Sequence, residues 1–322
     1  MPRAVKDDVA RLLGSPVARA ARVYGGYAPS ATFRMVLADG RRAFFKGVNP
    51  DSNRHMHEAL AQEEKVYRRL GALIAPWAPA FYGAFRREDW HVLLLEDVGR
   101  ADVPPWTSAR LRAAAHGFAT FHLANRGRRV PGWVSRTGWQ SFADLWRRLG
   151  ALEGGVRSAA ALAGRRAEEA DEWIDVALPV LARASERLRR VPRPYTLLHE
   201  DARSDNVRLT RGRLRIFDWN WAGVGPAEFD AAAFAQGITA DGGPEPERFL
   251  ALYEERAPLR PDVLADVVAS LAGYFASVAW RPPIPGLPRV RAVQRRQLKV
   301  CLPWAARLHG LPEPAWVRAV HD

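Results

Sequence analysis

Two short apolar stretches in the second half of the chain run into polar residues at a regular spacing. The first is followed by His199-Glu200-Asp201 and then, five residues after the aspartate, by Asn206. Twelve residues later, the second stretch ends in Asp218. Transfer of a phosphoryl group needs a carboxylate that orients the attacking hydroxyl group, and oxygen ligands for Mg²⁺ at the phosphates. Asp201 suits the first role as catalytic base, and Asn206 and Asp218 suit the second as metal ligands.

The alternative interpretation of this segment is an ordinary polar turn, because Asp, Ser and Asn are common loop residues. However, the kinase catalytic loop has the same His-x-Asp spacing, with Asn five residues after the aspartate. A second strand that ends in Asp218, at a suitable distance, makes coincidence a poor explanation. We therefore favour the functional interpretation. We expect His199 to brace the loop through hydrogen bonds rather than to carry protons.

A kinase also needs a cation on the phosphates and a group that holds this cation in place. Lys46 lies within Ala43–Val48, an apolar stretch that is typical of a strand. In the helix predicted after it, Glu63 shares one face with the apolar residues Met56, Leu60, Tyr67 and Leu70. A carboxylate that faces the core needs a partner. We predict an ion pair between Lys46 and Glu63, with Glu64 as the alternative if the helix is rotated.

The segments that position these residues divide the chain into two parts. The first part alternates between short strands and one helix, with a hairpin turn at Ala38–Arg41. The predicted strands are Val17–Tyr24, Thr32–Leu37, Ala43–Val48, Phe81–Phe85 and Val92–Glu96, and the helix is Asp51–Leu70. After Gly99, helices are predicted over Ser108–Asn125, Arg165–Arg190, Arg248–Glu255, Pro261–Ala279 and Arg289–His309, with strands at Leu197-Leu198 and Leu214–Phe217. This pattern predicts an α+β protein with a small antiparallel-sheet N-terminal lobe, residues 1–97, and a larger, mainly helical C-terminal lobe, residues 98–322.

The motifs resemble those of the aminoglycoside phosphotransferase and choline kinase-like family, which has a two-lobe, protein-kinase-like fold. The similarity rests on three segments: His199–Asn206, Ile216–Trp219 and Pro226–Asp230. It implies that Asp201 is the catalytic base, that Asn206 and Asp218 bind magnesium, and that Asp230 holds the loop after Asp218. The family usually has glycine where this chain has Glu200. This bulky acid would alter the geometry of the loop or add a contact to a cationic substrate.

The resemblance also implies contacts to a nucleotide in the N-terminal lobe. Gly25-Gly26 and Ser30 lie between two predicted strands and are similar to the phosphate-binding loop of the small-molecule kinases; a plain β-turn is the alternative. In this fold, adenine binds to the backbone of the connector that follows Leu93–Leu95. The carbonyl group of Glu96 and the amide group of Val98 are the candidates. Because these contacts use backbone groups, they do not distinguish ATP from GTP.

Composition limits the other classes of function. The 322 residues are 48% hydrophobic and 26% charged, which is typical of a globular protein. The net charge of +13 comes mainly from arginines scattered along the chain, so we expect no specific binding to nucleic acid. We expect neither a transmembrane helix nor a secretory signal, because the apolar runs are short and the first twenty residues are polar. The single cysteine, Cys301, indicates a reducing, cytoplasmic setting.

We predict an enzyme, an ATP- and Mg²⁺-dependent phosphotransferase that acts on a hydroxyl group of a small molecule. Its acceptor would be an aminoglycoside or another antibiotic, as in antibiotic resistance, or a related metabolite. The acidic residues in Glu168–Asp175 are either the solvated face of a helix or a site for substrate amines. Trp219 and Trp221 either pack in the core or hold a cationic acceptor. The alternative function is a non-catalytic, nucleotide- or ligand-binding pseudokinase on the same fold, which Glu200 beside the catalytic position suggests.

Overall fold

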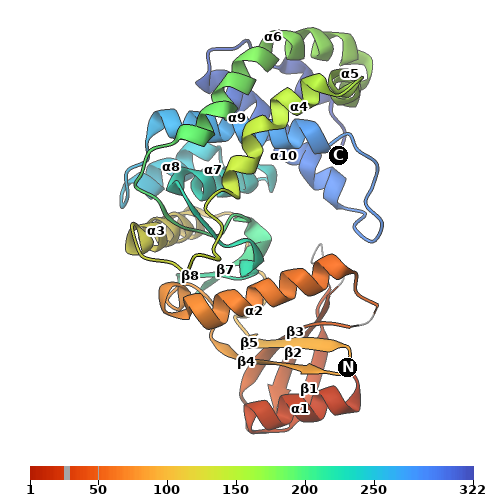
Figure 1. Ribbon diagram of the computed structural model, residues 1–322, viewed down its shortest axis with the longest axis vertical. Helices are drawn as coiled ribbons and strands as arrows, with labels where there is room; N and C mark the ends of the chain where they lie inside the picture. The colour runs from red at the N-terminus through yellow and green to blue at the C-terminus, as the bar shows by residue number, and fades with distance from the viewer. Residues whose placement is uncertain (25–29, 50) are drawn as a thin grey trace. The chain divides into compact units, whose positions relative to one another are not determined.

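The computed structural model describes residues 1–24, 30–49 and 51–322, which form two compact units (Figure 1). The first unit comprises Met1–Val103 and Asp205–Ala222, and the second comprises Pro104–Ser204 and Gly223–Asp322. The lobe boundary predicted after Asp97 lies six residues before the first of these divisions. Residues 205–222 group with the first unit, whereas the sequence analysis assigned them to the C-terminal lobe.

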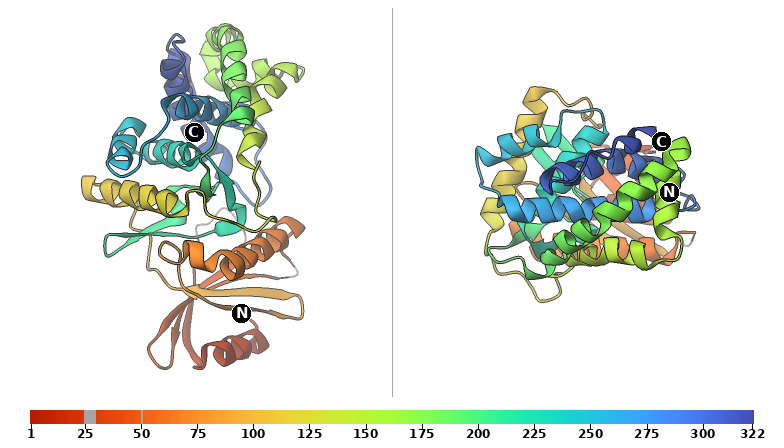
Figure 2. Two further views of the ribbon diagram at one scale, coloured as in Figure 1. Left: turned by 60° about the vertical axis from the view of Figure 1, so that its left-hand side comes forward. Right: turned by 90° about the horizontal axis from the view of Figure 1, so that it is seen from above.

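An antiparallel sheet of five strands, in the order β1-β2-β3-β5-β4, is the framework of the first unit (Figures 1 and 2). The strands are β1 (Val17–Arg22), β2 (Ala31–Leu37), β3 (Arg42–Val48), β4 (Phe81–Arg87) and β5 (Trp90–Glu96). All five strands predicted in this region are present. β2 and β3 form the predicted hairpin, in which Gly40 has a left-handed φ of 85° that glycine adopts without strain.

The two faces of this sheet carry different residues because side chains alternate along a strand. Phe45 and Leu94 point to one face, where Val9 of α1 (Arg3–Leu13) joins them in an apolar core. Lys46 therefore points to the opposite face, toward α2 (Arg54–Ile74). The sequence analysis predicted α2, but it did not predict α1.

A hairpin of β7 (Val207–Thr210) and β8 (Arg213–Ile216) also belongs to the first unit. The N–H group of Ile216 donates a hydrogen bond to the carbonyl group of Trp77, at 2.6 Å. The N–H group of Leu209 donates to the carboxylate of Asp102, at 3.0 Å. These bonds attach residues 205–222 to the N-terminal part of the chain.

Helices make up most of the second unit. They are α3 (Ser108–Asn125), α4 (Leu145–Ala151), α5 (Gly155–Ala160), α6 (Ala167–Glu186), α7 (Ala227–Ala240), α8 (Pro246–Glu254), α9 (Pro261–Val278) and α10 (Val290–Leu308). Helix α9 packs against both α6 and α10 (Figure 2). The strands β6 (Thr196–Leu198) and β9 (Gly223–Gly225) pair antiparallel. This arrangement confirms the α+β class, with an antiparallel sheet followed by a mainly helical part.

Helix α9 corresponds to the helix predicted over Pro261–Ala279, and no transmembrane segment was expected. Within the described residues, it is the one helix whose length and composition would allow it to cross a membrane, with a mean hydropathy of 1.2 over 18 residues. In the structure, 67% of these residues are buried inside the protein. A core helix has the same properties, so the length and composition of α9 are weak evidence for a membrane span.

Candidate active site

Lys46 of β3 lies between two carboxylates of the first unit. Its Nζ atom is 2.6 Å from Oε2 of Glu63 on α2 and 2.5 Å from Oδ1 of Asp218. The predicted ion pair between Lys46 and Glu63 is therefore present. Glu64, the alternative partner, instead contacts His91 at 2.7 Å. The apolar stripe of α2 thus has the rotation that the spacing of its residues indicated.

The electrostatics of this cluster keep the lysine charged. Burial alone would lower the pKa of Lys46, but the carboxylates of Asp218 and Glu63 outweigh burial and raise it well above its ordinary value. Burial raises the pKa of Glu63, which is fully buried, while Lys46 acts in the opposite direction. Asp218 is more accessible, because 40% of its side chain is exposed. Lys46 is therefore a fixed cation, held by one buried and one accessible carboxylate.

Asn206 and Asp218 lie at the open end of the β7–β8 hairpin, one directly before β7 and the other two residues after β8. The N–H group of Phe217 donates a hydrogen bond to the carbonyl group of Asn206, at 3.0 Å. Asn206 thus precedes a strand that was not predicted, and the pairing of this strand with β8 brings the two predicted metal ligands to one end of the hairpin. The described residues contain no cluster of three or more His, Cys, Asp or Glu side chains suited to a metal. One amide and one carboxylate still fit Mg²⁺, which retains water and binds substrate phosphates.

The predicted phosphate-binding loop is described only in part. Ser30 lies directly before β2 and is half-buried. Gly25-Gly26 lie outside the described residues, so the predicted bend over phosphates stays a prediction.

The connector predicted to bind adenine is held by hydrogen bonds. Glu96 ends β5, and its Oε2 accepts a hydrogen bond from the N–H group of Ala80, at 3.0 Å. The carbonyl group of Val98 accepts a hydrogen bond from the hydroxyl group of Thr210, at 3.2 Å. This bond does not use the amide group of Val98, which is the group predicted to contact adenine.

Asp97, between these two residues, was not singled out in the sequence. It accepts two hydrogen bonds from the guanidinium group of Arg34, at 2.7 and 2.9 Å, and its side chain is 2% exposed. The connector therefore starts from a residue that is tied to β2, on the far side of β3 from β5. An acidic residue at the end of an apolar strand is the only sequence signal that could have marked it.

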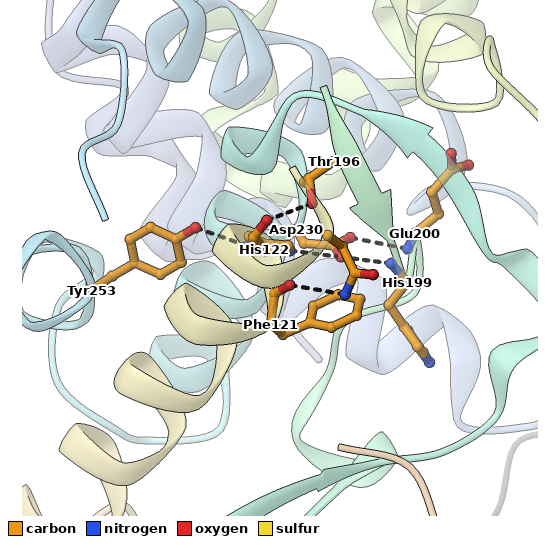
Figure 3. A network of polar contacts seen from close by, with 8 residues as sticks. Phe121, His122, Thr196, His199, Glu200, Asp230 and Tyr253 are labelled. Carbon is orange, nitrogen blue, oxygen red and sulfur yellow. Dashed lines mark hydrogen bonds and ion pairs between the residues drawn. The ribbon is translucent and has the colours of Figure 1, made fainter. Parts of the chain in front are cut away.

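Asp201 lies in the second unit, three residues after the end of β6. The two residues before it are anchored through their backbones. The N–H groups of His199 and Glu200 donate to the two carboxylate oxygens of Asp230, at 2.6 and 2.9 Å (Figure 3). Oδ1 of Asp201 is 3.4 Å from Nη1 of Arg203, and 27% of the side chain is exposed. A partly exposed carboxylate on an anchored turn can serve as a general base.

Asp230 is the centre of this network, and it is fully buried at the start of α7. Nε2 of His122 lies 3.3 Å from Asp230 Oδ2, and Nδ1 of the same ring lies 2.8 Å from the hydroxyl group of Tyr253 (Figure 3). We expected Asp230 to hold the loop after Asp218. Its hydrogen bonds instead hold the residues that precede Asp201. The sequence analysis did not identify His122, which is 108 residues from Asp230 along the chain.

Comparison with known proteins assigns the family. A model of the phosphotransferase enzyme family, APH, matches residues 20–265, which is most of the chain. The chain belongs to this phosphotransferase family. No curated protein sequence matches it significantly.

Solved structures show that this phosphotransferase-family chain has a protein-kinase-like fold. A choline kinase, LicA, from Streptococcus pneumoniae is 13% identical, with a TM-score of 0.60, over 93% of this chain and 98% of its own. A putative fructosamine-3-kinase from Thermobifida fusca is 19% identical, with a TM-score of 0.55, over 99% of both chains. The amicoumacin kinase hAmiN, in complex with AMP-PNP and Ca²⁺, is 13% identical, with a TM-score of 0.57, over 92% of both chains. At these identities the similarity establishes the fold.

Glu200 departs from the family pattern, and the structure shows where its side chain lies. Its backbone has a left-handed φ of 60°, which glycine adopts more readily. Burial, together with the charge of Asp230, raises the pKa of the Glu200 carboxyl group to about 8. The glycine that the family usually has here would adopt the same conformation, so both expected effects of Glu200 stay predictions.

The candidate acceptor residues are less distinctive. Glu168, Glu169, Glu172 and Asp175 are exposed on α6, and Glu169 pairs with Arg166 at 2.5 Å. These features fit the solvated face of a helix. Trp219 is fully buried, whereas Trp221 is 52% exposed. Trp219 is therefore a packing residue of the phosphotransferase-family fold.

Proposed function

We propose that the protein transfers a phosphoryl group from ATP, or GTP, to a hydroxyl group of a small molecule, with Mg²⁺ as the metal. The observation that carries this proposal is Lys46, held between buried Glu63 and accessible Asp218. Kinases use a lysine held by a glutamate to bind phosphates, and an aspartate to bind the metal. The family's kinase fold and the nucleotide complex of the amicoumacin kinase support the same conclusion.

Each of the site residues then has a separate task. Lys46 binds the phosphates, and Glu63 keeps its ammonium group in position. Asn206 and Asp218 hold Mg²⁺, which when bound neutralises the phosphate charge. Asp201 orients the acceptor hydroxyl group and accepts its proton. Ser30 and the backbone groups of Glu96 and Val98 complete the nucleotide contacts, as the family resemblance implies.

The acceptor is proposed to be an aminoglycoside, another antibiotic or a related metabolite. The kinases similar in structure to this chain are named for fructosamine, choline and amicoumacin. All three are hydroxylated small molecules that carry nitrogen, which supports an acceptor of this kind. We also propose a cytoplasmic location, because Cys301, the single cysteine, is buried as a free thiol.

A phosphorylation screen tests this proposal. Purified protein with Mg²⁺ and ATP or GTP is offered hydroxylated antibiotics, amino alcohols and amino sugars, and products are detected by mass spectrometry. We expect Asp201→Asn to lower the rate by about 10²- to 10⁴-fold, the usual contribution of a general base, without changing nucleotide affinity. The control is Asp7→Asn, which removes an exposed carboxylate of α1.

Two results would contradict the proposal in different ways. Nucleotide binding without any phosphorylated product would favour the pseudokinase alternative. Absence of nucleotide binding would contradict both the active kinase and the nucleotide-binding pseudokinase.

A further inference from the structure

Glu200 is a half-buried acid with a buried Oε1 atom, in a place where the backbone favours glycine. Its Oε1 atom has no hydrogen-bond partner among the described residues. The backbone N–H group of Trp139 lowers the pKa of the carboxyl group, against the effect of burial and of the Asp230 charge. Figure 3 shows the side chains of Glu200 and His199 pointing away from each other, while both backbone N–H groups meet Asp230. The carboxyl group therefore has a niche of its own, apart from the Asp230 network.

Two glycines of the second unit make room for this carboxyl group. A Cβ atom added to Gly223, at the start of β9, would overlap Oε1 of Glu200. A Cβ atom added to Gly138 would overlap Oε2. The same two segments are joined by a hydrogen bond from the Val224 N–H group to the Ser135 carbonyl group, at 2.8 Å. The niche is thus formed where the segment around Gly138 meets β9.

The Glu200 carboxyl group, rather than the backbone conformation, is what a larger residue would meet first at these positions. Gly138 has φ −53° and ψ −53°, which any residue adopts. Gly223 also lies outside the left-handed region and pairs with Leu198 of β6. An alanine at either position would therefore fit the backbone but collide with the Glu200 side chain.

The surroundings of the niche disfavour a charged carboxylate. Asp230 on α7 is the ionisable neighbour that acts on Glu200, and its negative charge repels a second one. The segment around Gly138 contributes the N–H group of Trp139, which lowers the pKa of the carboxyl group, and β9 contributes no charged side chain. One nearby N–H group does not compensate for the burial of a charged carboxylate. A carboxyl group that loses its proton here is expected to leave the niche.

We propose that Glu200 is a positioning residue for Asp201, because its carboxyl group fills the niche between Gly138 and Gly223 and so fixes the turn that carries Asp201. The turn is then held at two points, by Asp230 through the backbone and by the niche through the Glu200 side chain. The proposal rests on the proposed kinase function, since Asp201 is the base of that reaction.

A double-mutant cycle tests the steric part of the proposal. Gly223→Ala is expected to lower the melting temperature by about 2–10 °C, as overpacking does, and kcat by about 10- to 100-fold, because small displacements of a catalytic group have effects of this size. In a Glu200→Gly background, the same change should have little further effect. Gly138→Ala provides a second, independent cycle if one variant does not fold. Equal losses in both backgrounds would overturn the proposal.

The pH profile tests the positioning role. For the wild-type protein, kcat should fall above about pH 8, as Glu200 ionises and leaves the niche. Glu200→Gln, which keeps shape without charge, should retain kcat and lose this alkaline decline, with no change in the KM for the nucleotide. Glu200→Gly should lower kcat at every pH. An unchanged alkaline decline in Glu200→Gln would overturn the positioning role.

Stability provides a measurement that needs no acceptor. The pKa of Glu200 is higher in the folded than in the unfolded protein, so its ionisation in the unfolded state opposes folding. The melting temperature of the wild-type protein should therefore fall relative to Glu200→Gln between about pH 4.5 and 8. If no acceptor is phosphorylated, the kinase function and the positioning role both fail, whereas this difference would still show that the niche is occupied. A difference in melting temperature that does not change with pH would show that the niche is not occupied.

Discussion

The two units hold their proposed functional residues by different interactions. In the first unit, side-chain charges do so, since Lys46 is paired with Glu63 and Asp218. In the second unit, Asp201 follows residues whose backbone N–H groups donate to Asp230. The first arrangement depends on which side chains carry charge. The second depends on the path of the backbone and on one buried acceptor.

This difference determines how each region should respond to substitution. Removal of one partner from a buried ion pair leaves a charge without compensation, and it also removes a group that binds the nucleotide. Removal of a backbone acceptor leaves buried N–H groups without partners, which lowers stability before it affects chemistry. Substitutions in the Lys46 cluster should therefore change catalysis and binding more than stability. Substitutions at Asp230 should change the free energy of unfolding most.

Of the substitutions that test this comparison, Lys46→Met is expected to have the largest effect. This change keeps the length of the side chain and removes the cation that the two carboxylates hold. Phosphoryl transfer should fall by about 100-fold or more, corresponding to the loss of about 3 kcal/mol from a charged hydrogen bond. The rate is measured with the acceptor found in the screen. Lys65→Met, which alters an exposed lysine of α2, should leave the rate unchanged, and equal losses in both variants would contradict the role of Lys46.

The second-largest effect, a loss of stability, is expected for Asp230→Asn. The amide keeps one acceptor oxygen but turns an NH₂ group toward a backbone N–H group. We expect the free energy of unfolding to fall by about 2–3 kcal/mol, since one buried donor loses its partner and the charge is lost. Urea denaturation measures this change, with Asp89→Asn at an exposed turn as control. A loss of activity without a loss of stability would show that Asp230, like Lys46, acts mainly on catalysis and binding.

The smallest effect is expected for Glu63→Gln, which we compare with the same change at the neighbouring Glu64. Glu63→Gln leaves Lys46 paired with Asp218 alone, so we expect kcat/KM for the nucleotide to fall by about 10-fold, or about 1.4 kcal/mol. Glu64→Gln changes a carboxylate that contacts Arg68 and His91. It should lower kcat/KM by less than about 2-fold. Similar losses in the two variants would show that position on the helix, not pairing with Lys46, is responsible.

Helices and strands with one buried face could be predicted because their signal is periodic and local. Helix α7 was missed because it is buried nearly all round, so its apolar residues show no helical period. Helix α1 was missed although Val5 and Val9 have helical spacing. Residues 205–222 donate hydrogen bonds to Trp77 and Asp102, which are far away in the chain. No pattern within residues 205–222 indicates these partners.

The sequence by itself determined the features that depend on side-chain type at short spacing. Glu63 had to pair because an apolar helix face carried it, whereas the β7–β8 hairpin that makes Asn206 and Asp218 neighbours was not predicted. Only the tertiary structure decided that Asp230 anchors the residues before Asp201, 30 and 31 positions away, and that Gly138 and Gly223 make room for Glu200. Such contacts depend on where distant segments meet. A local pattern of residues does not contain that information.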